Sequence, residues 1–401
     1  MKTKLNILAA LLLTTGVSAL ELENMQIFGY GNINFSTYDY QENWQSDPES
    51  RSKVDLERFT LITRYMISDT ITIVSELEYE HGGTGSTMEY DRKEEMGEFE
   101  TEVEKGGEIV LEELNVVVTT DKPWLNYRVG HMLVGVGMLT ARHLPNLYHS
   151  PYRNRSESRI IPSTWHETGV ELYGTFNDKF HYQAQILTGL NSEFFDSSGW
   201  IKNGMQKRFE HVNADELAGV IRLSYGDLTG DQIGVSLYRG NSGGNRNKSN
   251  RDIEGTVTIA SAHAVFSYED FTFRGMYMWG NLSDSAELTR ANYNMPGTIR
   301  SANHSIAEEA VAYFAEVGYD ISSLIGWDNA ITLWGRYDFS DTMYKVAPGV
   351  IKRDRYEQET ISGGINYAFS ENLQLKTEIE RTTLGNGTDL NSMTASVAFQ
   401  F

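Results

Sequence analysis

The feature that most constrains this sequence is a two-residue alternation of apolar and polar side chains, which recurs along almost its whole length. In one stretch near the amino terminus, the apolar and small positions are Ile27, Gly29, Gly31, Ile33 and Phe35. In a stretch at the carboxyl terminus, they are Met393, Ala395, Val397, Phe399 and Phe401. A period of two is that of a β-strand whose two faces meet different surroundings. No long stretch beyond the first 19 residues shows the 3.6-residue period of a helix, so we predict an all-β chain.

The connections between these stretches alternate in length. Short ones include residues 68–70, 177–179, 269–270 and 371–372, and long polar ones lie at 41–53, 82–97, 138–163, 191–215, 242–254, 282–307, 341–354 and 383–390. Counting the strands between them gives 16. A soluble β-sandwich, the alternative fold, would have connections of mixed length. We therefore predict a 16-stranded antiparallel transmembrane β-barrel with short periplasmic turns and long extracellular loops.

Aromatic residues gather at the predicted strand ends, as they do in the interfacial girdles of membrane barrels. They are Tyr38, Tyr79, Tyr225, Tyr238, Trp279, Tyr319 and Phe369. The chain ends on Phe401, and this ending is similar to the carboxy-terminal signal of outer-membrane barrels. We expect the first strand, near Met25–Tyr38, to pair with the last, Ser392–Phe401, and so to close the barrel.

Residues 1–19 have the form of a secretory signal peptide. Two lysines precede an apolar stretch from Leu5 to Leu13, and Val17-Ser18-Ala19 supplies the small residues at a signal-peptidase site. The apolar stretch is too short for a permanent transmembrane helix. We therefore predict an exported protein whose residues 20–401 form a barrel in the outer membrane of a Gram-negative bacterium.

Composition excludes several classes of function. A formal net charge of −21 excludes a basic nucleic-acid binder, and the absence of cysteine excludes thiolate chemistry and Cys-ligated metals. Hydrolysis would need a serine or threonine with a histidine, and the nearest candidate, His263, has no serine partner that we can name. We predict a protein without catalytic residues, cofactor or bound metal, and an outer-membrane barrel hydrolase is the alternative.

If the apolar positions face outward, the charged positions of the other parity face the interior. The cations among them are Arg58, Arg64, Arg128, Arg222, Arg274, Arg336 and Lys376. The acids are Glu76, Glu78, Glu80, Glu113, Glu171, Glu316, Asp338, Glu378 and Glu380. In a water-filled interior these charges would orient polar solutes. The alternative is that they only pair with neighbours across strands.

The third long connection reverses the sign of the chain's charge. The stretch from Met138 to His166 contains four arginines and only one acid, Glu157. It also contains His143, His149, Tyr148 and Tyr152. We predict that this loop folds into the pore and that guanidinium groups there hold anionic groups of solutes. The predicted solute-contact residues are Arg142, Arg153, Arg155, Arg159, His149, Tyr152, Arg58, Arg64, Arg128 and Arg336. The alternative is a surface loop with solvated charges.

Residues 89–108 show the opposite bias, with nine acids against three bases. Glu98, Glu100, Glu102 and Glu104 alternate with Phe99 and Val103, which predicts an extended hairpin for part of the segment. The segment could bind divalent cations with lipopolysaccharide or contact a neighbouring barrel, and a solvated acidic loop is the alternative.

The run Arg159–Val170, with Ile160-Ile161-Pro162-Ser163-Thr164-Trp165 at its centre, is the most specific of several sequence blocks. The others are Gly106–Glu112, Arg128–Gly137, Tyr313–Asp320 and Gly335–Tyr337. Together these blocks resemble the phosphate-selective porin superfamily of Gram-negative bacteria. The resemblance implies a trimer of 16-stranded barrels that conduct small solutes passively.

The resemblance favours a pore more than it favours phosphate. The third long connection contains no lysine, and the predicted interior holds many carboxylates. We therefore expect passive diffusion of small hydrophilic solutes, with a preference for those that carry a carboxylate or a phosphate. A cation-preferring general porin is the alternative that the acidic interior suggests. The expected partners are outer-membrane lipid, lipopolysaccharide and two further copies of the chain.

Overall fold

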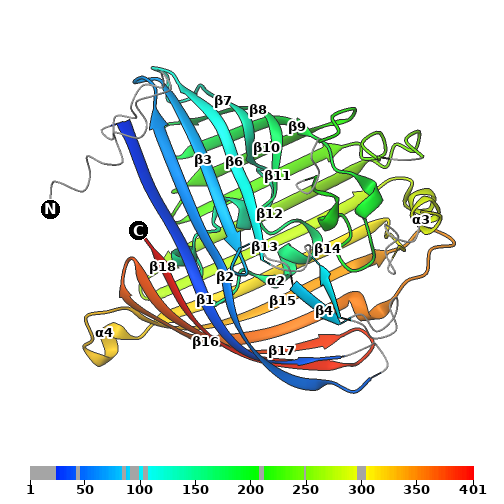
Figure 1. Ribbon diagram of the computed structural model, residues 1–401. Coiled ribbons are helices and arrows are strands. Elements are labelled where there is room, and N and C mark those ends of the chain that lie inside the picture. Colours follow the sequence, from blue (N-terminus) through cyan, green and yellow to red (C-terminus); the bar gives the residue numbers. More distant parts are fainter. Residues whose placement is uncertain are drawn as a thin grey trace.

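Sixteen antiparallel strands close into one barrel in the computed structural model, which confirms the predicted all-β fold and strand number (Figure 1). The structure describes residues 24–41, 46–83, 87–90, 99–102, 107–206, 212–247, 250–295 and 304–401. The predicted signal peptide, residues 1–19, lies outside these ranges. Within them, no helix is long and apolar enough to cross a membrane.

The barrel strands follow one another around the wall in chain order. They are β1 (Met25–Tyr40), β2 (Glu49–Met66), β3 (Ile71–Glu80), β6 (Glu108–Thr119), β7 (Asn126–Leu133), β8 (His166–Phe176), β9 (Phe180–Thr188), β10 (Leu217–Gly226), β11 (Gln232–Gly240), β12 (Val257–Tyr268), β13 (Phe271–Leu282), β14 (Glu309–Asp320), β15 (Ile331–Lys345), β16 (Glu357–Ser370), β17 (Leu373–Leu384) and β18 (Asp389–Gln400).

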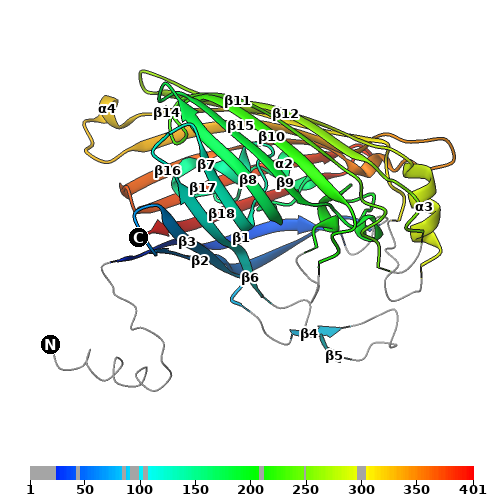
Figure 2. The ribbon, with the colours of Figure 1, turned by 90° about the horizontal axis from the view of Figure 1, so that it is seen from above.

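The acidic segment carries a separate two-stranded sheet of β4 (Thr87–Tyr90) and β5 (Phe99–Glu102). Residues 91–98 and 103–106 of the segment lie outside the described ranges. In the described residues, the connections contain three short α-helices, namely α2 (Arg155–Ile160), α3 (Ser285–Tyr293) and α4 (Ser322–Ile325). None of them was predicted from the sequence, because helices of four to nine residues give too few turns for a periodic signal. Figures 1 and 2 show α3 and α4 at opposite ends of the barrel.

The predicted closure of the barrel by its first and last strands is confirmed. Gly31 lies opposite Phe399, and Gly29 and Phe401 exchange two backbone hydrogen bonds of 2.9 and 3.0 Å. A Cβ on Gly31 would lie 2.9 Å from the Phe399 ring, and one on Gly29 would lie 2.9 Å from the Phe401 ring. Glycine therefore makes room for the terminal aromatic rings at the seam.

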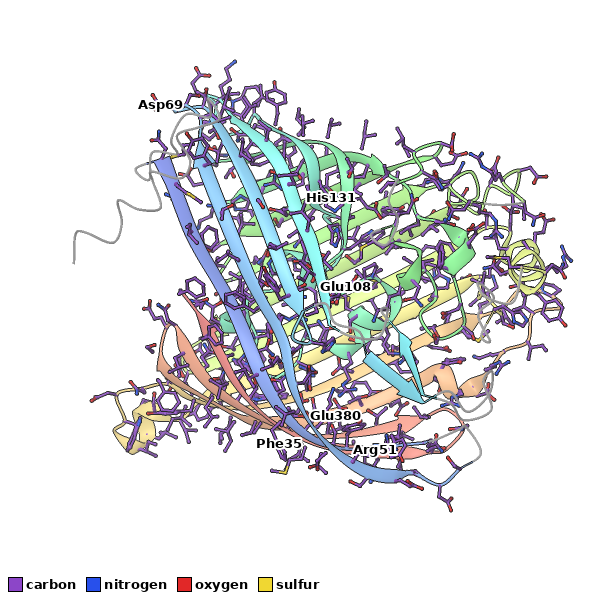
Figure 3. The ribbon with its side chains drawn as sticks, viewed as in Figure 1. Phe35, Arg51, Asp69, Glu108, His131 and Glu380 are labelled. Atoms are coloured by element: carbon purple, nitrogen blue, oxygen red, sulfur yellow. The ribbon has the colours of Figure 1, made fainter. Side chains whose placement is uncertain are left out.

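The predicted outward face is the exposed one. Phe35, labelled in Figure 3, is 53% exposed. Ile361 on β16 and Met393 on β18 are also more than half exposed. An apolar wall of this extent is stable against lipid hydrocarbon and costly against water. Two predicted girdle residues face inward instead. Tyr38 lines a cavity inside the barrel, and the Tyr238 ring centroid lies 4.8 Å from that of Trp165.

One side of the interior is filled by apolar side chains, which the sequence analysis did not foresee. The inward residues of β10–β14 that take part are Ala218, Val220, Tyr238, Val257, Ile259, Met276, Met278, Leu282, Ala310, Ala312 and Phe314. They form one buried cluster with Trp165, with Trp200 from the connection 189–216, and with Leu288 of α3. Polar and charged inward side chains are instead gathered along β1–β3 and β15–β18.

Candidate functional site

The connection between β7 and β8, residues 134–165, runs through the interior of the barrel. It contains two 3₁₀ turns, η2 (Leu139–Ala141) and η3 (Pro145–Leu147), followed by α2. Pro145 begins η3, where its fixed φ is favourable and its missing N–H is not needed. Asn154 caps α2 by accepting a 3.0 Å hydrogen bond from the Glu157 N–H. We refer to residues 138–159 as the interior segment.

The interior segment contacts the wall on several sides (Figure 1). Lys376 of β17, which is fully buried, donates to the carbonyl oxygens of Pro145, Tyr148 (2.7 Å) and Ser150 (3.3 Å). Ser156 donates to Asp338 of β15 at 2.9 Å. Further along the same part of the wall, the Tyr152 hydroxyl lies 3.1 Å from that of Ser36 on β1, which is two strands from β17. These contacts attach the interior segment to the wall from β15 to β1.

Glu157 holds the beginning of the interior segment. Its buried carboxylate accepts backbone hydrogen bonds from Met138 at 2.8 Å and Leu139 at 3.0 Å. Gly137, with φ of 74°, is required beside it, because a Cβ there would overlap the Glu157 carboxylate. Burial raises the pKa of Glu157 to about 7.

This raised pKa predicts a pH-dependent stability. Since the folded protein holds the Glu157 proton more tightly than the unfolded chain, with its ordinary pKa of 4.5, stability is greatest below pH 4.5 and falls as the pH rises through about 7. The loss amounts to roughly 3 kcal/mol at about 1.4 kcal/mol per pKa unit. Glu157→Gln should remove this part of the dependence, which thermal unfolding midpoints between pH 5 and 8 would measure. Equal slopes in the two proteins would contradict the assignment.

Three of the predicted arginines that belong to barrel strands are paired with carboxylates on the wall. Arg336 lies 3.3 Å from Glu316 and 2.6 Å from Asp338. The others form the pairs Arg58–Glu78 at 2.8 Å and Arg128–Glu171 at 3.4 Å. Arg336 faces Glu316, and Arg128 faces Glu171, directly across adjacent strands. Cross-strand pairing, the alternative reading of the interior charges, thus describes these residues.

Two predicted residues lie apart from the others. Arg142 donates to the carbonyl oxygens of Leu228, Thr229 and Gly230 in the short turn between β10 and β11, at 2.8 to 3.1 Å. The Arg64 side chain is exposed near the end of β2 that leads into the short turn to β3. Its guanidinium carbon lies 5.1 Å from the Phe28 ring centroid. The single positive region predicted from the sequence therefore does not include these two.

The histidines of the third connection do not share a site. His149 is buried, and burial together with Arg274 lowers its pKa, so the ring is neutral at pH 7. Its Nδ1 donates to Glu316 at 3.0 Å. His166 instead contacts His131 at 2.6 Å, and His143 lies beside Tyr30. In the described part of the chain, no group of three His, Asp or Glu side chains has the geometry of a metal site.

A cavity of about 570 Å³, which we call the vestibule, lies above the interior segment at the ends of β1, β2 and β16–β18 that lead into the long connections. Its lining includes six cations, Lys53, Arg58, Arg153, Arg155, Arg159 and Lys202, and three acids, Asp39, Glu57 and Glu380. Tyr152 also lines it. The structure thus brings five of the predicted residues to one cavity, where positive charge exceeds negative charge by three.

The vestibule arginines differ in their partners. Arg155 is 2.8 Å from Glu380, which Figure 3 labels. Arg153 donates to the Thr164 hydroxyl, and Arg159 donates to the Ser198 carbonyl oxygen at 3.3 Å. Among the described residues, no ion pair joins Arg153 or Arg159 to a carboxylate. Neither guanidinium group therefore has a direct carboxylate partner in this part of the chain, although Glu78 acts electrostatically on Arg153 and Asp196 on Arg159.

Sequence reasoning missed Lys53 and Lys202 in the vestibule. The register between β1 and β2 shifts between Asn32 and Asn34, which marks a bulge in β2. Both Glu57 and Arg58 therefore face inward. Before the bulge, the odd-numbered residues of β2 face inward, whereas after it the even-numbered ones do. Lys53 thus lies opposite the inward Ser36. Lys202 comes from the connection 189–216, whose path no local pattern indicated.

Comparison with known proteins supports the fold. No family model matches the chain, so membership of the phosphate-selective superfamily stays a prediction. An uncharacterized protein of Aquifex aeolicus (strain VF5) is 24% identical over 381 residues, which cover 94% of this chain and 80% of that protein. Three solved barrels are similar in structure at low sequence identity, each over 94% of this chain.

Two of these structures are described as a channel or a porin. The outer membrane channel DcaP of Acinetobacter baumannii has a TM-score of 0.54 at 12% identity, with 97% of its chain covered. The anion-selective porin of Comamonas acidovorans has a TM-score of 0.52 at 10% identity, with 99% covered. OmpF of Salmonella typhi in complex with daunomycin has a TM-score of 0.54 at 12% identity, with 97% of its chain covered. The chain therefore has a barrel fold similar to that of these proteins.

Proposed function

We propose that this protein is an outer-membrane porin through which small hydrophilic solutes diffuse passively, with a preference for solutes that carry a carboxylate or a phosphate. The observation that carries the proposal is the vestibule, a cavity of about 570 Å³ whose lining includes six cations and three acids. This local excess of positive charge occurs in a chain whose net charge is −21. The channel and the porin among the solved proteins of the same fold support the pore.

The vestibule can select anions through both its charge and its hydrogen-bond donors. Guanidinium groups bind carboxylate and phosphate oxygens in a planar, two-pronged geometry. Confinement between low-dielectric walls concentrates the field of these charges, whereas exposed charges on the outer loops are screened beyond about 8 Å at physiological salt. The vestibule therefore acts on an entering ion more strongly than the acidic segment 89–108 does.

The proposed setting follows the sequence analysis. The apolar outer wall lies in the lipid of a Gram-negative outer membrane, with lipopolysaccharide on the extracellular side, after removal of residues 1–19. The proposed assembly is a homotrimer. Narrowing of the polar path by the interior segment predicts a small unitary conductance.

The hydrolase alternative depends on His263. Its Nε2 lies 3.1 Å from the Arg222 guanidinium, which is a cation and cannot serve as a nucleophile. This contact favours the pore. In a planar bilayer, the purified protein should give stepwise currents that are linear in voltage. Ester or peptide hydrolysis that disappears in His263→Ala, without such currents, would support the hydrolase instead.

A further inference from the structure

The outer wall of the barrel carries an apolar groove of about 700 Å³ across β7–β11. Two rows of outward residues, aligned by the strand register, form it. The first row runs through Val129, Val170, Ile186 and Gly219 to Arg239, and the second through Tyr127, Leu172, Ala184, Ile221 and Leu237. Five strands spaced by about 4.8 Å give the groove a length of about 19 Å.

Small residues make the groove deep at its centre. A Cβ on Gly219 would meet no atom within 4 Å, and Ala184 lies in the adjacent row. Ile186 and Ile221 stand beside them, each more than half exposed. Glycine inside a strand weakens the strand and often marks a place where a ligand approaches the backbone. The groove is thus formed by two adjacent rows of side chains and is lined by hydrocarbon.

A cation stands at one end of the groove. Arg239 projects outward near the end of β11 that leads into a long connection, and its guanidinium is 3.5 Å from the Thr258 hydroxyl. No ion pair between described residues includes Arg239. By contrast Arg381, which faces outward near the same end of β17, is neutralised by Asp389 at 2.7 Å. An outward guanidinium is tolerated at the membrane interface, where it can meet an anionic headgroup.

We propose that this groove binds an acyl chain of a phosphate-bearing glycolipid of the extracellular leaflet, whose phosphate is held by Arg239. The apolar rows match the hydrocarbon chain, and the single cation at the extracellular end matches the headgroup in sign and position. The site requires the barrel to lie in a membrane but does not require it to conduct. Success or failure of the lipid site is therefore separate from that of the proposed pore.

Native mass spectrometry of the full-length protein in detergent, with added bisphosphorylated lipid A, tests the site. Arg239→Ala should lower retention of this lipid at least tenfold and leave retention of dephosphorylated lipid A unchanged. Gly219→Ile should lower retention of both, because its side chain fills the groove. The matched controls are Arg381→Ala and Gly335→Ile. Gly335 is also outward, and a Cβ there would meet only the Ser362 carbonyl oxygen, at 3.9 Å.

Two outcomes would overturn the proposal. One is equal retention of bisphosphorylated lipid A by Arg239→Ala and Arg381→Ala. The other is that Gly219→Ile dissociates the oligomer while leaving lipid retention unchanged, which would make the groove an interface between copies of the chain. Far-ultraviolet circular dichroism of all four variants should match that of the wild type, which shows that each has folded into a barrel.

Discussion

Lys376→Met should raise the single-channel conductance at least twofold and add slow current noise. Lys376 is the fully buried donor that ties three carbonyl groups of the interior segment to β17. Methionine has a similar length but no donor, so each orphaned buried carbonyl costs about 1–3 kcal/mol. The interior segment would then leave the wall part of the time and widen the polar path. Single-channel recording in a planar bilayer measures both effects.

Gln374→Met is the matched control for this prediction. Gln374 lies on the same strand and also faces inward, but its amide contacts Asn366 at 3.2 Å and does not contact the interior segment. The control should conduct like the wild type. If Lys376→Met conducts like its control while folding normally, the interior segment does not limit the current.

The second large effect concerns ion selectivity. Replacing both Lys53 and Arg155 by alanine should lower the ratio of chloride to potassium permeability about fivefold. Both side chains are nearly half exposed, so their truncation leaves no cavity in the wall, although Glu380 loses its partner Arg155. A unit charge about 7 Å from an ion in water contributes about 0.6 kcal/mol, so two charges shift chloride and potassium by about 1.2 kcal/mol each, in opposite directions. Screening over a Debye length of about 8 Å reduces the combined shift to about 1 kcal/mol, or roughly fivefold. Reversal potentials in a KCl gradient measure the ratio.

Arg251→Ala serves as the control for surface charge. Arg251 is an exposed cation of a long connection, is paired with Asp215, and does not line the vestibule. Its loss should leave the ratio unchanged, and the effect of the double variant should shrink at high salt because the charges are screened. A double variant that matches Arg251→Ala would show that the vestibule does not select ions.

The barrel could be predicted from the sequence because its signals are local. Alternation places Phe35 and Met393 outward and Lys376 inward without knowledge of any distant contact. Alternating connection lengths give the strand order directly, since each strand pairs with its neighbours in the chain. The positive bias of the third connection likewise identified Arg153, Arg155 and Arg159, which the structure brings to one cavity.

The rest of the site depends on features that a single stretch does not reveal. The bulge in β2 changed the parity that would have identified Lys53. Arg142 and Arg336 could not be distinguished from the vestibule arginines by the sequence pattern. In the structure Arg142 binds the turn between β10 and β11, and Arg336 binds the carboxylates of Glu316 and Asp338. The apolar side of the interior arises where several long connections meet, which no local pattern predicts.

The wild-type reversal potential in a tenfold KCl gradient tests the central claim most directly. If the vestibule sets the selectivity, the potential has the sign of chloride preference at physiological ionic strength and moves toward zero as salt rises. A potential with the sign of potassium preference, unchanged in the variant that combines Arg153→Ala and Arg155→Ala, would show that the acidic residues control the pore and would contradict an anion-preferring porin.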